Sequence, residues 1–127
     1  MTLEEIREAY AQHPLDGGAH DLVPSWLEDM IAPLYAQEEV EDPIVWAKYF
    51  LPESRYTLFA TEFSRVAPDG YPNLFFGLVK SPFGPAFDEL GYVTLEQLES
   101  VKSPLLGLGI ERDIYFVPQR LSAFEGE

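Results

Sequence analysis

The stretch ELGYVTLEQLESVKSPLLGLGIERDIYFV, residues 89–117, decides the fold of this chain. Its pattern predicts a short strand, a helix over 95–101 and a longer strand over 110–117. Thr94 and Gln97 have the reciprocal spacing of a capping box, in which each side chain accepts a hydrogen bond from the other residue's backbone N–H. We therefore expect the helix to begin at Thr94, and the prolines and glycines that follow it to supply turns into the last strand.

One charged residue stands out in the predicted last strand. Successive side chains alternate between the two faces of a strand, so Arg112 shares its face with the apolar residues Ile110, Ile114 and Phe116. An unpaired guanidinium is very costly in such a row, and we expect a carboxylate from Glu62 or Glu89 to pair with it. The simplest interpretation is a structural ion pair. The alternative is a polar cluster that binds or transforms a ligand.

The N-terminal part, residues 1–37, is predicted to be helical. Thr2 and Glu5 have the spacing of a second capping box, which begins a helix that runs to about residue 12. A loop over 13–21 follows, and Pro24 then suits the first turn of a second helix.

The sheet core is predicted over residues 44–117. Alternating apolar residues between proline- and glycine-rich turns indicate a mostly antiparallel sheet whose five strands span 44–51, 56–64, 74–80, 89–93 and 110–117. Gly77, inside the third of these, predicts a bulge or the close approach of another segment. With helix 95–101 packed on one face, the chain is expected to form one α+β domain over residues 1–127.

Charge is the strongest feature of the composition. The chain has 22 Asp and Glu residues against 8 Lys and Arg residues, a formal net charge of −14. Such a field repels nucleic acid, which needs a basic surface to displace its counterions, so direct nucleic-acid binding is disfavoured. The same field attracts a basic protein surface, although many cytosolic proteins are acidic simply because net charge keeps them soluble.

Several kinds of site are poorly supported by the residue types present. The chain has no cysteine, which excludes disulfides, thiolate metal sites and cysteine nucleophiles. Its two histidines, His13 and His20, lie outside the predicted sheet, so a histidine metal site or a catalytic triad is not expected. No apolar run is long enough to span a membrane, and the acidic N-terminus does not resemble a signal peptide. We expect a cytoplasmic protein.

Two segments are candidate binding surfaces. Four acids in five residues, Glu38, Glu39, Glu41 and Asp42, form either a solvated linker into the sheet or the acidic lip of a partner site. The irregular segment 81–87 holds two phenylalanines, and Phe83 in particular is either a cover for the core or an exposed anchor for a partner.

A second hypothesis comes from the carboxylates near the predicted strands. Glu62, Glu89, Glu111 and Asp113 are the residue types that a magnesium-dependent nuclease or phosphoryl-transfer site needs, because hard cations take oxygen ligands. However, Glu111 and Asp113 are predicted to face away from Arg112. No phosphate-binding glycine loop, nucleophile elbow or metal-ligand spacing is present in the sequence either. The sequence therefore favours a protein without catalytic, metal-binding or cofactor-binding residues.

Several runs of the sequence resemble one family of small bacterial, plasmid and phage domains. The runs are Trp46–Phe50, Thr61–Phe63, Phe76–Val79, Glu89–Leu98 and Gly109–Phe116. The similarity covers about residues 22 to 124, and its most specific parts are the Glu-Leu-Gly-Tyr and Glu-Arg-Asp runs. The family carries only a domain-of-unknown-function label, the twenty-nine-fifty-eight family. The resemblance implies a setting on mobile elements, near antirestriction and conjugation functions.

These observations predict a non-catalytic, acidic interaction protein of phage or plasmid type. We expect it to bind and modulate a host protein with a basic, nucleic-acid-binding surface, in an antirestriction or other anti-defence role first and on the host transcription machinery second. The expected binding residues are the acidic patch over 38–42 together with Glu62, Glu89, Glu111, Arg112, Asp113 and Phe83. The sequence leaves the partner and the oligomeric state open.

Overall fold

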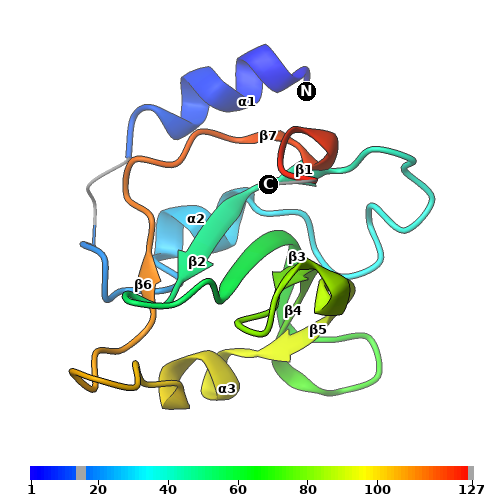
Figure 1. Cartoon of the computed structure of the whole chain (residues 1–127). Helices are drawn as coiled ribbons and strands as arrows, with labels where there is room; N and C mark the ends of the chain where they lie inside the picture. The colour runs from blue at the N-terminus through cyan, green and yellow to red at the C-terminus, as the bar shows by residue number, and fades with distance from the viewer. Residues whose placement is uncertain (14–16, 126–127) are drawn as a thin grey trace.

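The computed structural model describes residues 1–13 and 17–125 and confirms the α+β class (Figure 1). Among these described residues, five strands form an antiparallel sheet in the order β5-β4-β3-β2-β6, and two more form a small separate sheet of β1 and β7. The strands are β1 (Ile44–Val45), β2 (Ala47–Phe50), β3 (Thr57–Val66), β4 (Pro72–Lys80), β5 (Glu89–Thr94), β6 (Glu111–Arg112) and β7 (Gln119–Arg120).

Both predicted capping boxes are present. Thr2 and Glu5 cap α1 (Leu3–Tyr10), and Thr94 and Gln97 cap α3 (Leu95–Ser100). The second helix, α2 (Ser25–Met30), begins directly after Pro24. The described part of the chain also contains two short 3-10 turns, η1 (Pro85–Phe87) and η2 (Leu121–Ala123). Part of the predicted loop after α1, residues 14–16, lies outside the described residues.

The predicted continuous strand over 44–51 is wrong, because the chain changes partner at Trp46. Before this residue, β1 pairs with β7 in the small sheet; after it, β2 pairs with β3 in the large one. The Trp46 N–H donates to the Ala60 carbonyl at 2.8 Å, so β3 still holds the chain at the break. β2 and β3, which follow each other in the chain, pair as an antiparallel hairpin.

The predicted last strand over 110–117 is also wrong, since β6 ends at Arg112. The Asp113 side chain accepts a hydrogen bond from the Tyr115 N–H at 2.9 Å. The backbone carbonyl of Asp113 accepts one from the Phe116 N–H at 3.2 Å. These local bonds close a turn, which is the usual way in which aspartate competes with strand pairing. The strand propensity of the apolar residues after Asp113 is thus overridden.

A β-bulge in β3 changes the face on which Glu62 lies. The register of β3 with β4 shifts between Ala60 and Glu62, which leaves Thr61 as the extra residue. Glu62 therefore pairs with Phe76, although simple alternation predicts it on the other face. Gly77 confirms the predicted close approach: a Cβ atom there would lie 2.1 Å from the Phe59 carbonyl oxygen.

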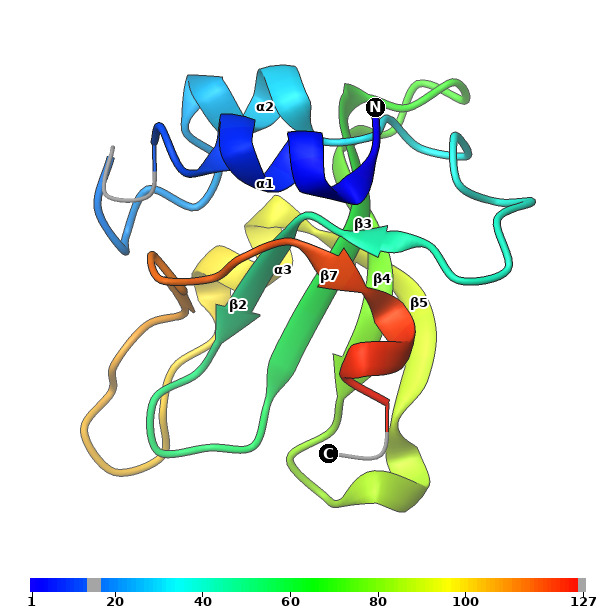
Figure 2. The same ribbon diagram turned by 90° about the horizontal axis from the view of Figure 1, so that it is seen from above.

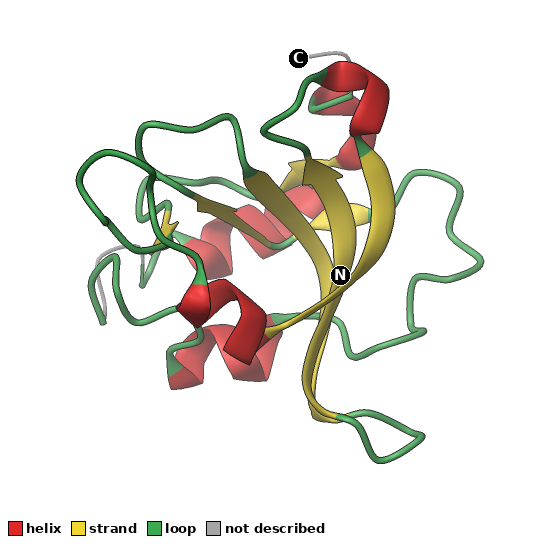
Figure 3. Ribbon diagram, turned by 60° about the horizontal axis from the view of Figure 1, so that its bottom comes forward, coloured by secondary structure: helices red, strands yellow, loops and turns green. Residues whose placement is uncertain are grey.

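The two faces of the large sheet are covered differently. On one face Tyr49, Phe63 and Phe75 pack ring against ring, and the helices gather mainly on one side of the twisted central strands (Figure 3). Tyr10 and Trp26 join α1 to α2 with ring centroids 5.0 Å apart. In the other direction the loop over 35–43, cyan in Figure 2, extends away from the sheet.

No helix in residues 1–13 and 17–125 is long and apolar enough to cross a membrane.

Candidate functional site

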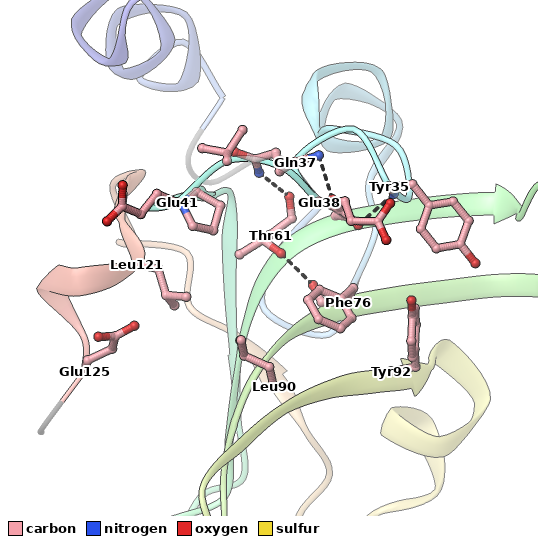
Figure 4. A pocket seen from close by; sticks show the side chains of 13 residues that line it. Tyr35, Gln37, Glu38, Glu41, Thr61, Phe76, Leu90, Tyr92, Leu121 and Glu125 are labelled. Carbon is pink, nitrogen blue, oxygen red and sulfur yellow. Dashed lines mark hydrogen bonds between the residues drawn. The ribbon is translucent and has the colours of Figure 1, made fainter.

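A groove on the second face of the sheet has the best-defined geometry for binding. It encloses a cavity of about 280 Å³ between the loop over 35–43, strands β3, β4 and β5, and the C-terminal turn (Figure 4). We call it the acidic groove; it is lined by Tyr35, Gln37, Glu38, Val40, Glu41, Pro43, Thr61, Glu62, Phe76, Leu90, Tyr92, Leu121 and Glu125.

Glu62 forms the inner end of the acidic groove and holds the loop in place. Its side chain is only 3% exposed, and its two carboxylate oxygens accept from the backbone N–H groups of Tyr35 at 2.8 Å and Gln37 at 2.7 Å. Tyr35 is held with a φ of 72°, a conformation that non-glycine residues seldom adopt. The carboxylate therefore stabilises a strained turn in the groove wall.

Gln37 completes the attachment of the loop to the sheet. Its side-chain amide donates to the carbonyls of Ile44 at 2.9 Å and Thr61 at 2.7 Å, and its side-chain oxygen accepts from the Ile44 N–H at 2.8 Å. The carbonyl of Thr61 belongs to the extra residue of the bulge. The bulge in β3 is thus part of what positions the groove.

The opposite wall is aromatic and apolar. Glu62, Phe76 and Tyr92 are direct cross-strand neighbours on β3, β4 and β5, and the rings of Phe76 and Tyr92 lie 4.9 Å apart. Leu90 and Tyr92 are 54% and 53% exposed. Partial desolvation, reinforced by Tyr35 and by nearby carboxylates, raises the pKa of Tyr92. Leu90 and Tyr92 thus present adjoining apolar surface to solvent along one wall of the groove.

The rim of the groove is acidic. Glu38, Glu41 and Glu125 are exposed and stand around the opening, and Figure 4 shows Glu41 and Glu125 on the side of Leu121 and Glu38 nearer the tyrosines. No lysine, arginine or histidine belongs to the lining among the residues that the structure describes. The groove thus combines four carboxylates with aromatic rings, an arrangement suited to a cationic group.

Arg112 lies elsewhere, and both partners predicted for it are wrong. Its neighbour Tyr49 packs on Phe75, on the face opposite Glu62, while Glu89 is on β5 at the far edge of the sheet. The guanidinium, 1% exposed, donates to the carbonyls of Asp21 at 2.9 Å and Gly18 at 2.8 Å. Its central carbon lies 5.4 Å from the Trp26 ring. Arg112 holds the segment before α2 against the sheet.

The carboxylates of the second hypothesis do not share a site. Glu89 and Glu111 lie on β5 and β6, the two opposite edges of the sheet. Asp113 closes the turn after β6 and lies 4.0 Å from the Lys48 ammonium, while Glu62 is held by the loop. Within residues 1–13 and 17–125, no group of three or more histidine, aspartate or glutamate side chains is placed to hold a metal ion.

The acidic patch divides between two roles. Glu38 and Glu41 line the groove, whereas Glu39 is exposed outside the lining. Asp42 accepts from the Ser122 N–H at 2.9 Å and from its hydroxyl at 2.7 Å, which lowers the pKa of Asp42 and ties the C-terminal turn to the loop. Phe83 is 82% exposed in the loop before β5, outside the groove.

Sequence reasoning missed most of the groove. Tyr35, Gln37, Leu90, Tyr92 and Glu125 were not predicted as site residues, and only Leu90 and Tyr92 left a signal, since alternation places both on one face of a short strand. Sequence reasoning also missed the bidentate pair of Arg55 with Asp88, at 2.6 and 2.7 Å, which closes the loop before β5 and lowers the pKa of Asp88.

Fold and groove together define a small α+β domain with an acidic, aromatic-walled groove. Residues 22–125 match the model of a family described as "Protein of unknown function (DUF2958)", and the chain belongs to that family. A search of curated proteins and a search of solved structures find no match. The match begins after α1, so this helix is an addition to the part that the family model covers.

Proposed function

We propose that this protein is a non-catalytic interaction protein that binds the basic surface of a nucleic-acid-handling host protein and modulates its activity. The observation that carries the proposal is the acidic groove, where four carboxylates and three aromatic rings line one cavity and no basic side chain is among the described lining residues. An excess of 14 negative charges adds long-range attraction to a basic partner.

We propose first an anti-defence role, in which the partner is a host defence protein such as a restriction enzyme. The second proposed partner is the host transcription machinery. Both classes present basic surfaces that ordinarily contact nucleic acid, and an acidic protein competes for such surfaces by charge complementarity. The mobile-element setting implied by the family resemblance supports the anti-defence choice. We place this interaction in the cytoplasm, where both kinds of host protein work.

A salt titration with a charge-matched control tests the proposal. The affinity of the purified chain for a purified restriction endonuclease, and separately for RNA polymerase, is measured across ionic strengths. We expect affinity for one of them to fall steeply as salt screens the charges, and DNA to compete with the chain for that partner. Affinity that is insensitive to salt for both, or the absence of binding at low salt, contradicts the proposal.

The control separates the acidic groove from general acidity. The double variant Glu38→Gln with Glu41→Gln removes two charges from the groove rim, whereas Glu96→Gln with Glu99→Gln removes two from exposed positions on α3. We expect the first pair to weaken binding about tenfold and the second pair to have little effect. Equal losses from both pairs mean that only net charge matters and that the groove has no special role.

A further inference from the structure

The free edge of the large sheet borders the acidic groove. β5 is the outermost strand and is antiparallel to β4, so alternate N–H and C=O groups of its backbone point away from the sheet. Leu90 and Tyr92 stand on this strand two residues apart and both line the groove. An extended segment that pairs with β5 places alternate side chains beside these two residues.

A buried negative charge marks the inner end of the same groove. Glu62 is 3% exposed, and its carboxylate oxygens accept from the neutral N–H groups of Tyr35 and Gln37. The ion pairs formed within the described part of the chain are Lys48–Asp113, Arg55–Asp88, Arg65–Glu28 and Lys80–Asp88, none of which includes Glu62. A buried carboxylate is best balanced by a cation, and here the space beside it is open.

Building on the proposed function, we propose that the groove recognises one extended, basic segment of the partner protein by strand addition to β5. The backbone of the segment pairs with the free edge of β5. One apolar side chain packs on Leu90. A Lys or Arg side chain two residues away lies against Tyr92, with its charge directed to the carboxylates of Glu38 and Glu62.

This arrangement predicts a pattern in the bound segment. Leu90 and Tyr92 are separated by one residue whose side chain faces the other side of the sheet, so the partner residues opposite them are also two apart. The residue between is Gly91, where an added Cβ atom would meet no described atom within 4 Å. The segment therefore has an apolar and a basic residue at positions i and i+2, and tolerates a range of residues between them.

The test uses a short peptide with threonine at odd positions and valine and lysine alternating at even positions. Two comparison peptides carry glutamate in place of lysine, or N-methyl groups on alternate backbone nitrogens, which block strand pairing. Each is titrated into the full chain at low salt, and amide chemical shifts are followed by NMR. We expect the lysine peptide alone to bind, with shifts concentrated in β5 and residues 35–43.

A pair of matched variants gives the quantitative readout. Tyr92 and Tyr71 are 53% and 54% exposed, but only Tyr92 belongs to the groove lining. We expect Tyr92→Lys to weaken binding of the lysine peptide about tenfold, and Tyr71→Lys, which changes the net charge equally, to change it by less than about twofold. Retained NMR dispersion in both variants shows that they fold.

Three results overturn the inference. The first is equal weakening of peptide binding by both variants, and the second is equal binding of the N-methylated peptide. The third is that free spermidine at similar concentration produces the same shifts, which would make the ligand a small cation.

The proposed function fails separately. If the host protein still binds with steep salt dependence to the Tyr92→Lys chain, strand addition is rejected and the proposed function stands. If the peptide binds as expected but neither host protein does, the proposed function is rejected and the groove chemistry stands.

Discussion

Arg112 and Glu62 are both charged and almost fully buried, at 1% and 3% exposure, yet they serve different ends. The Arg112 guanidinium is enclosed by backbone carbonyls of residues 18 and 21 and by the Trp26 ring. The Glu62 carboxylate is held by two N–H groups but borders an open cavity. Both buried charges stabilise the fold, but only the Glu62 carboxylate also borders the open volume of a candidate binding site.

Replacing Arg112 tests its structural role and has the largest expected effect. Arg112→Ala removes an almost fully buried side chain and leaves the carbonyls of Gly18 and Asp21 without this donor, and we expect the free energy of unfolding to fall by about 3 kcal/mol. Arg120→Ala, at an exposed position, is expected to cost less than about 0.5 kcal/mol. Urea denaturation measures the loss for both variants. Similar losses would mean that the enclosed guanidinium of Arg112 has no special role in stability.

Gly77 and Gly91 face each other across β4 and β5 and form a matched pair. A Cβ atom at Gly77 would lie 2.1 Å from the Phe59 carbonyl oxygen, whereas nothing lies within 4 Å of one at Gly91. We expect Gly77→Ala to lower the free energy of unfolding by about 2 kcal/mol, and Gly91→Ala to leave it unchanged or raise it by about 0.5 kcal/mol. A loss on Gly91→Ala would show that the free edge is less open than the structure indicates.

Alkaline unfolding probes the buried residues around Arg112 and Trp26 through Tyr10, whose ring packs on Trp26. Burial raises the pKa of Tyr10 from 10.0 to about 12, so between these values the unfolded chain has lost this proton and the native chain retains it. The free energy of unfolding should therefore fall by about 1.4 kcal/mol per pH unit over this window on account of Tyr10.

Tyr10→Phe removes this dependence and is expected to be almost neutral at pH 7, because no described residue bonds the Tyr10 hydroxyl. Tyr115→Phe is the control, since Tyr115 is 79% exposed. The measurement is urea denaturation at several pH values up to 12. An unchanged slope for Tyr10→Phe would mean that its hydroxyl reaches solvent in the native state.

The smallest effect is expected in the groove itself. Leu90→Thr with Tyr92→Thr replaces two half-exposed side chains on β5 with threonine, a β-branched residue of high strand propensity, so the free energy of unfolding should change by less than about 0.5 kcal/mol. Thermal and urea unfolding of the double variant measure this. A loss as large as that of Gly77→Ala would assign the aromatic wall to the core instead of a contact surface.

Features set by residues close in sequence could be predicted. The capping boxes of α1 and α3 depend on side chains three residues from the backbone groups that they bond. The predicted strands β3, β4 and β5 are confirmed, although the bulge in β3 interrupts its alternation, and the close approach at Gly77 is confirmed as well. The exposure of Phe83 was one of two alternatives, which sequence could not decide because burial depends on what packs above it.

The candidate site was only partly predictable. Glu62 was identified from the sequence, but as a partner of Arg112; the bulge at Thr61 turns it to the other face, where it holds the loop over 35–43. Glu38 and Glu41 were predicted to belong either to a solvated linker or to the acidic lip of a partner site, and in the structure they line the groove. Nothing in sequence spacing brings Tyr35, Tyr92 and Glu125 together, since they come from three separated segments.

By itself, the sequence determined the α+β class, the helix starts and the antiparallel strands β3 and β4. It also determined the net negative charge, whose field attracts basic surfaces. Only the tertiary structure decided where β6 ends, which face Glu62 occupies and that a cavity separates the loop from β5. The reason is the range of the forces: caps and alternation act over a few residues, whereas one extra residue in a strand reverses a face, and its effect depends on which distant strand lies opposite.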